Sequence, residues 1–123
     1  MREMLNCKIH GGTVTASDID YEGSCGLGPD LLKASGLLPF EKISVLNVSN
    51  GNRVETYVIK ESKNREITLN GAAAHFFKEG DKVIILNWKI CGESCIKGHK
   101  AKVIILDDDN LIKKEMVKVV GDE

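Results

Sequence analysis

Residues 43–59 are ISVLNVSNGNRVETYVI, two alternating runs of apolar and polar residues on either side of Asn50-Gly51. Alternation with a period of two is typical of strands that bury only one face. The Asn-Gly pair favours a tight turn, because both residues tolerate the positive φ that a two-residue hairpin requires. We therefore expect a β-hairpin with strands at residues 43–48 and 53–59.

Most of the remaining chain also favours strands. Short runs of β-branched and aliphatic residues are separated by glycines and polar turn residues. A bend is expected near Gly11-Gly12, inside the first of these runs. The runs cover residues 4–15, 67–69, 82–90, 101–106 and 111–120. Many short strands in one small chain favour a closed barrel.

One short helix is expected after Gly28. Pro29 suits its first turn, and Gly36 suits the left-handed residue that follows its last turn. Residues 71–77 favour a turn or a single helical turn, and residues 121–123 a frayed tail. The predicted fold is therefore mainly β, a small barrel with one or two short helices.

The length and charge of the chain limit its class. With 123 residues, it has the size of one domain, so we expect residues 1–123 to form a single domain. The net charge is −1 and no dense basic run is present, which argues against nucleic acid or an anionic membrane as partner. The longest aliphatic runs have four residues, 83–86 and 103–106, against the roughly 20 of a membrane-spanning helix. No signal peptide is visible, so we expect a cytoplasmic protein.

Cysteine usage indicates no metal site. In a reducing compartment all four thiols are expected to be free. They are Cys7, Cys25, Cys91 and Cys95. On a helix, Cys91, Cys95 and His99 would share one face, because they are spaced four residues apart. Gly92 and Gly98 disfavour that helix, and a fourth ligand would have to come from elsewhere. We predict no metal, and a flexible loop between two strands.

The segment Tyr21-Glu-Gly-Ser-Cys25 opens a glycine-rich stretch that ends at Gly28. This stretch matches neither a dinucleotide fingerprint nor a P-loop, and it is not a nucleophile elbow. Gly-Ser is a common turn pair, so composition alone predicts an ordinary turn.

Four further motifs give this segment a specific context. In order and spacing, the five motifs together resemble the aspartate α-decarboxylase family. They are Lys8-Ile9-His10, Tyr21 to Cys25, Asn47 to Gly51, Arg53 with Thr56-Tyr57, and Asn70 to His75. The resemblance covers about residues 4–87; beyond Asn87 only size and strand content are similar.

The resemblance implies a double-psi β-barrel that assembles as a homotetramer with active sites between subunits. It also implies that the cofactor is a covalent pyruvoyl group made from Ser24. The Ser24 hydroxyl would attack the Gly23 carbonyl, giving an ester by an N-to-O acyl shift. Elimination and hydrolysis would then leave the pyruvoyl group on residues 24–123 and release residues 1–23. That group would form a Schiff base with L-aspartate and give β-alanine and carbon dioxide, a step in pantothenate supply.

Further roles are implied for residues matching the family. Tyr57 corresponds to the proton donor, and Thr56 and Tyr21 correspond to residues that support processing. Arg53 is suited to grip a carboxylate with two parallel hydrogen bonds. The implied substrate contacts are Lys8, His10, Arg53, Thr56, Asn70, Gly71, Ala72 and Ala73.

The chain departs from the family pattern at two positions. Gly11 stands where arginine is usual, and Leu46 where an aromatic residue is often found. Two other interpretations stay open: a pyruvoyl decarboxylase of another acidic amino acid, and a β-barrel binding module that never cleaves. Cleavage would either be spontaneous or need a maturation factor.

Overall fold

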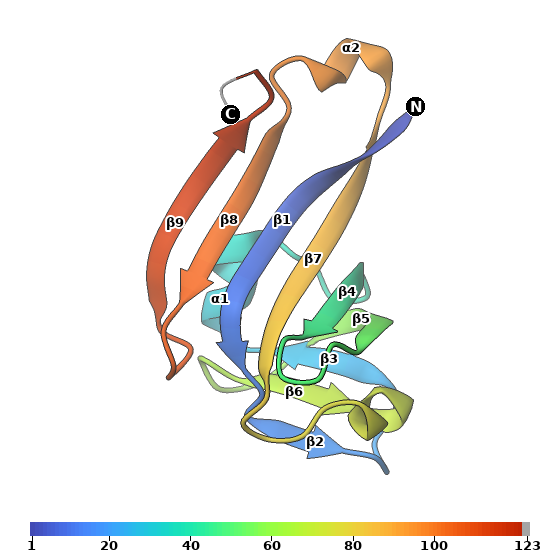
Figure 1. The fold of residues 1–123 in the computed structure, drawn as a ribbon, viewed down its shortest axis with the longest axis vertical. Helices are drawn as coiled ribbons and strands as arrows, with labels where there is room; N and C mark the ends of the chain where they lie inside the picture. Colours follow the sequence, from blue (N-terminus) through green and yellow to red (C-terminus); the bar gives the residue numbers. More distant parts are fainter. Residues whose placement is uncertain (122–123) are drawn as a thin grey trace.

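The computed structural model describes residues 1–121 and shows a mainly β fold with two short α-helices in that range (Figure 1). The strands are β1 (Arg2–Thr13), β2 (Ala16–Asp18), β3 (Ser24–Leu27), β4 (Lys42–Asn47), β5 (Arg53–Lys60), β6 (Ile67–Asn70), β7 (Lys82–Cys91), β8 (Lys100–Leu106) and β9 (Ile112–Val119). The helices are α1 (Pro29–Ser35), α2 (Glu93–Ile96) and the 3-10 helix η1 (Gly71–His75). Of the expected frayed tail, residues 122–123 lie outside the described part of the chain.

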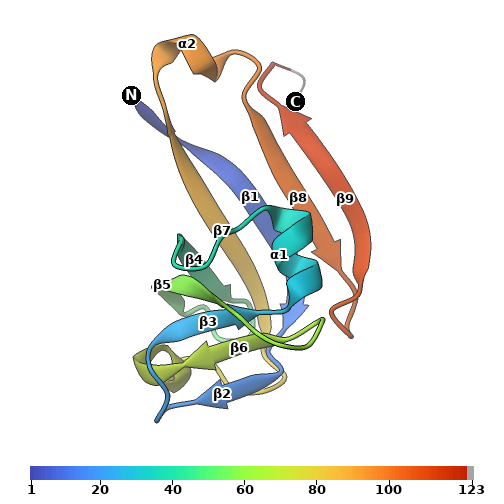
Figure 2. The same cartoon turned by 180° about the vertical axis from the view of Figure 1, so that it is seen from behind.

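Hydrogen bonds join the strands in the order β2-β6-β3-β5-β4-β7-β1-β8-β9. The long strands β1, β7, β8 and β9 lie side by side, and the shorter strands cross below them (Figures 1 and 2). The mainly β prediction with short helices is confirmed. Within residues 1–121, backbone pairing does not link the outer strands β2 and β9, so closure as a double-psi barrel stays a prediction.

The predicted hairpin is confirmed as β4 and β5, which pair antiparallel from Lys42 opposite Tyr57 to Leu46 opposite Arg53. The two-residue turn is wrong in detail. Gly51 has φ 80°, but Asn50 is not among the residues with positive φ. Instead, the Asn50 side chain accepts a hydrogen bond from the Asn52 amide (2.9 Å). This side-chain contact closes the longer loop, so the backbone needs only one left-handed residue.

The helix after Gly28 is also confirmed. Pro29 begins α1, and Gly36 follows it with φ 76°, donating its amide to the Leu32 carbonyl at 2.9 Å. Leu31 is fully buried in the core. The helix packs against β1 and β8, so it covers one face of the long strands (Figure 2).

The predicted bend in the first strand is confirmed at the register shift between His10 and Gly12. Gly11 lies there with φ 84°, and a Cβ on it would come 3.1 Å from the Leu106 carbonyl oxygen. A side chain in that conformation is strained. The glycine that departs from the family pattern is therefore the residue that this local backbone favours.

The turn that composition alone favours ends before Ser24, because residues Ser24–Leu27 form β3, a strand buried along its whole length. It lies between β5 and β6 and is covered on both faces, so its sequence shows no alternation. A Cβ on Gly26 would collide with Thr68 Oγ1 and the Glu61 side chain. Glycine therefore permits the close approach of these neighbouring segments.

Candidate active site

Ser24 begins β3, and only 1% of it is exposed to solvent. Antiparallel pairing of β3 with β6 places it opposite Asn70. Asn70 Nδ2 donates a hydrogen bond to Ser24 Oγ (3.1 Å), and Ser24 Oγ donates one to the Glu22 carbonyl oxygen (3.3 Å). The hydroxyl is therefore held on the side of the chain that precedes Ser24, where the Gly23 peptide lies.

The 3-10 helix η1 packs against this peptide through its first residue, Gly71. Gly71 has φ 67°, and a Cβ on it would lie 2.6 Å from both the nitrogen and the Cα of Gly23. It would also come 3.0 Å from the Tyr21 carbonyl oxygen. No real Cβ fits at 2.6 Å, so the contact requires glycine at position 71.

In the uncleaved chain, the surroundings of Gly23 do not themselves require glycine at that position. Gly23 is exposed, lies outside the positive-φ set, and has no atom within 4 Å of an added Cβ. The steric demand for glycine falls on Gly71 instead. No local sequence signal could have shown this, because the two residues meet only through the pairing of β3 with β6.

Gly71→Ala should slow self-cleavage by on the order of 10²-fold, because the new methyl group displaces the Gly23 peptide from the Ser24 hydroxyl. Time-resolved denaturing gels and intact mass would measure the processed fraction. Gly80→Ala is the matched control: Gly80 also has positive φ, 94°, but nothing lies within 4 Å of its added Cβ. Equal slowing in both variants would mean that backbone strain, not the Gly23 contact, controls processing.

Tyr57 lies beside Ser24 on the neighbouring strand. β3 and β5 run parallel with Cys25 opposite Val58, and Ser24 and Tyr57 each precede these partners by one residue. Tyr57 is 36% exposed, and its ring lies 6.3 Å from that of Phe40, measured between centroids. Thr56, half-buried, takes the opposite face of β5. Phe40 is a neighbour that the sequence did not indicate.

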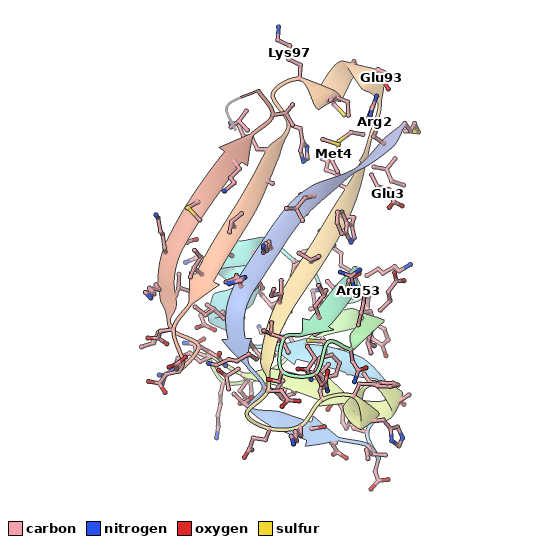
Figure 3. The ribbon with its side chains drawn as sticks, in the orientation of Figure 1. Arg2, Glu3, Met4, Arg53, Glu93 and Lys97 are labelled. Atoms are coloured by element: carbon pink, nitrogen blue, oxygen red, sulfur yellow. The ribbon has the colours of Figure 1, made fainter. Side chains whose placement is uncertain are left out.

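Arg53 lines a hollow of about 370 Å³ formed by the β4–β5 hairpin and Ile84 of β7. Leu46 and Ile84 form its apolar wall. The Arg53 side chain is exposed beside β4 and β5 (Figure 3). Leu46, the second departure from the family pattern, is thus a direct neighbour of a predicted substrate cation.

Lys8 and His10 lie elsewhere. Both project from the same face of β1 and line a separate hollow of about 330 Å³ with residues of β8 and β9. Lys8 is half-buried and His10 is exposed. Within one chain, the structure therefore does not bring these two residues together with Arg53 in one hollow.

The remaining predicted residues are distributed around η1. Ala73 is buried next to the core, whereas Ala72 is exposed. Tyr21 is 54% exposed, and it meets the site through its backbone carbonyl, which faces Gly71. Glu22, which the sequence did not single out, supplies the carbonyl that accepts from Ser24.

Among residues 1–121, no group of three or more His, Cys, Asp or Glu side chains is arranged to hold a metal ion. In the same range, no helix is long and apolar enough to cross a membrane. The surroundings of Ser24 are suited to its conversion into a pyruvoyl group. The serine that would become that group is buried and hydrogen-bonded on both sides, next to an exposed glycine peptide.

Comparison with known proteins assigns this mainly β chain to the carboxy-lyase class of enzymes. The family model described as aspartate decarboxylase matches residues 1–113. The chain belongs to the aspartate decarboxylase family. The similarity therefore continues past Asn87, where the sequence motifs alone had placed its end.

Individual relatives support the same assignment. An aspartate 1-decarboxylase of Ralstonia nicotianae is 46% identical over 114 residues, covering 92% of this chain and 95% of the relative. One from Desulfotalea psychrophila is 44% identical over 119 residues, covering 96% and 99%. One from Bordetella avium is 46% identical over 114 residues, covering 92% and 93%.

Proposed function

We propose that this chain converts L-aspartate to β-alanine and carbon dioxide with a pyruvoyl group made from its own Ser24. The observation that carries the proposal is the buried Ser24 hydroxyl, held between Asn70 and the Glu22 carbonyl beside the Gly23 peptide. Family membership and identities near 46% over 92% of the chain support aspartate as substrate.

Self-cleavage begins with attack of Ser24 Oγ on the Gly23 carbonyl carbon. The peptide nitrogen leaves as the ester forms, so the backbone rearranges from N-acyl to O-acyl. Asn70 orients the hydroxyl for this step, since its amide donor fixes the oxygen at 3.1 Å. Thr56 and Tyr21 support the rearrangement. Elimination and hydrolysis complete the cleavage of a single domain into residues 1–23 and 24–123.

The pyruvoyl group supplies the electron sink that decarboxylation needs, which no ordinary side chain offers. The residues of the chain bind and orient the substrate and deliver the proton. Arg53 binds a substrate carboxylate, and Tyr57 donates the proton to the carbon that has lost carbon dioxide. Exposed Ala72, just after the end of β6, contacts the substrate, and Gly71 keeps this segment against the Gly23 peptide.

A complete site is built from more than one subunit. Support comes from the two hollows: Arg53 lines one, and Lys8 and His10 line the other. We therefore propose a homotetramer, in which Lys8 and His10 reach the pyruvoyl group across a subunit contact. Sedimentation of the processed enzyme tests this, and a fully active monomer would contradict it. A cytoplasmic location and a maturation factor stay predictions.

Intact mass and product analysis of the purified protein test the proposed function. We expect two pieces split between Gly23 and Ser24, with the larger one blocked at its N-terminus, and β-alanine formed from L-aspartate. A free N-terminal serine on the larger piece would indicate plain hydrolysis. A single uncleaved chain would favour the binding module. Faster turnover of another acidic amino acid would favour the other decarboxylase.

Arg53→Ala should raise the KM for aspartate by roughly 10- to 100-fold, because one carboxylate loses a charge-assisted partner. Processing at Ser24 should be complete, since Arg53 lines a hollow to which Ser24 does not contribute. The control is Arg2→Ala, which removes an exposed arginine at the far end of the sheet (Figure 3). An unchanged KM in fully processed Arg53→Ala would exclude Arg53 from substrate binding.

A further inference from the structure

The connection between β7 and β8 brings two cysteines and a histidine together. Figure 1 shows α2 at the end of the sheet farthest from β2 and β6. The expected flexible loop contains this short helix, and the backbone amide of Cys95 donates to the Gly92 carbonyl (3.0 Å). The Cys95 thiol donates to the same oxygen at 3.2 Å. The exposed Cys95 side chain is therefore folded back toward Cys91, the last residue of β7.

His99 is oriented as a base toward Cys91. Its Nε2 lies 2.7 Å from the Leu5 carbonyl oxygen, and its Nδ1 lies 3.7 Å from Cys91 Sγ. A carbonyl oxygen only accepts hydrogen bonds, so Nε2 carries the proton in the neutral ring. Nδ1 then has the free lone pair, and the Cys91 thiol donates to it. A thiol paired with a base that a third group orients is an arrangement suited to nucleophilic chemistry.

The two thiols lie near each other because both adjoin Gly92: Cys91 precedes it in the chain, and the Cys95 thiol donates to its carbonyl oxygen at 3.2 Å. The neighbouring Cys95 side chain, followed by burial, raises the pKa of Cys91. Cys91 is only 2% exposed, whereas Cys95 is open to solvent. Cys95 is thus the sulfur that a small reagent reaches first, and Cys91 is a protonated thiol beside it with a base at hand.

We propose that Cys95 and Cys91 form a redox-active pair, which a hydroperoxide oxidises to a reversible disulfide across α2 with His99 as the base for Cys91. The Cys95 sulfur attacks a peroxide oxygen: the S–O bond forms, the O–O bond breaks, and Cys95 becomes a sulfenic acid. The proton that the Cys95 thiol loses goes to the leaving hydroxide or alkoxide, which departs as water or alcohol. His99 Nδ1 then takes the Cys91 proton, and the Cys91 sulfur attacks Cys95. The S–S bond forms as the S–O bond of Cys95 breaks, and the hydroxide leaves with the proton from His99 as water. Two thiols lose two electrons, and the peroxide gains them.

The surroundings favour oxidation over metal binding. In residues 1–121, no group of three or more His, Cys, Asp or Glu side chains is arranged to hold a metal ion. The charged groups at this end are well exposed: Arg2 and Glu93 form an ion pair at 3.5 Å, with side chains 64% and 76% exposed (Figure 3). The Cys95 side chain is itself exposed, so a small oxidant reaches it from solvent.

The other two cysteines of the chain serve as internal controls for the reaction of thiols with peroxide. Cys7 and Cys25 are fully buried in the core. Burial, reinforced by nearby carboxylates, raises the pKa of Cys7 to about 11 and that of Cys25 to about 12. Thiols that are neither ionised nor accessible react slowly with peroxide. Both should therefore stay reduced under conditions that oxidise Cys95.

The experiment treats the full-length protein with hydrogen peroxide, blocks free thiols by alkylation and maps the peptides by mass. We expect a Cys91–Cys95 disulfide, lighter by two hydrogen atoms and restored by a dithiol reductant, with Cys7 and Cys25 alkylated. An unchanged mass, a sulfinic acid on Cys95 in the wild-type protein, or a disulfide between two chains would overturn the pairing.

Two variants test the individual roles. Cys91→Ser should stop at a Cys95 sulfenic acid that a dimedone probe traps. His99→Gln keeps a donor for the Leu5 carbonyl but removes the base, so disulfide formation should slow by on the order of 10²-fold. His75→Gln, which changes an exposed histidine on η1, is the matched control and should oxidise at the wild-type rate. An unchanged rate in His99→Gln would show that His99 is not the base.

Discussion

Ser24→Ala should remain a single chain of 123 residues and make no detectable β-alanine. The variant lacks the oxygen that attacks the Gly23 carbonyl, and it lacks the atom from which the ketone is made. Both losses are absolute, so no slow residual activity is expected. Intact mass after prolonged incubation and a β-alanine assay measure the two effects separately.

The fold should survive this substitution. Alanine fits the buried position of Ser24, but it leaves the Asn70 amide donor without its partner, at a cost of about 1–3 kcal/mol. Ser35→Ala is a matched control, because Ser35 is 3% exposed and its hydroxyl contacts only α1 and Leu37. It should lose similar stability yet cleave normally. Two pieces from Ser24→Ala would show that water, not Ser24, breaks the chain.

Elements with local signals were predictable from the sequence. The β4–β5 hairpin follows from alternation around one Asn-Gly pair, and α1 follows from Pro29 and Gly36. Each signal acts on residues close in the chain, so it needs no knowledge of the rest of the fold. Even there, the turn differed, because the Asn50 side chain replaced a backbone contact that a two-residue turn would make.

The site itself could not be predicted from local patterns. Ser24 and Asn70 are 46 residues apart, and only the register of β3 on β6 brings them within hydrogen-bonding distance. The same register presses Gly71 against Gly23. β3 gave no strand signal because it is buried on both faces. Only the resemblance to a family placed Ser24 and Asn70 in one site. Members of a family share a fold, so matching motifs imply the same pairing of distant segments.

At α2, local signals correctly excluded one long helix but could not show how the surrounding side chains would be arranged. Gly92 and Gly98 disfavour one long helix through Cys91, Cys95 and His99, and none forms. A short helix and the returning strand β8 nevertheless bring the three side chains together. Tertiary contacts, here the His99 hydrogen bond to Leu5 on β1, decided the arrangement.

Tyr57→Phe should fold and cleave normally but lose about 10²-fold or more in β-alanine turnover. The step after carbon dioxide leaves is protonation of a carbanion-like carbon, which needs a donor within about 3 Å in a water-poor site. The tyrosine hydroxyl is a hydrogen-bond donor, so it can hold a proton toward this carbon. Phenylalanine keeps the ring and its contact with Phe40, 6.3 Å between centroids, and removes only the hydroxyl.

The measurement is steady-state turnover of the fully processed variant, with processing checked by mass and the pyruvoyl group by borohydride reduction. Both checks should match the wild-type protein, because Tyr57 flanks Ser24 on β5 without hydrogen bonding to its hydroxyl, which Asn70 and Glu22 hold. A reduced kcat with an intact pyruvoyl group then places the loss in proton delivery rather than in cofactor formation. If the processed variant makes β-alanine at the wild-type rate, the proton comes from a bound water or another side chain, and Tyr57 serves only to pack against Phe40.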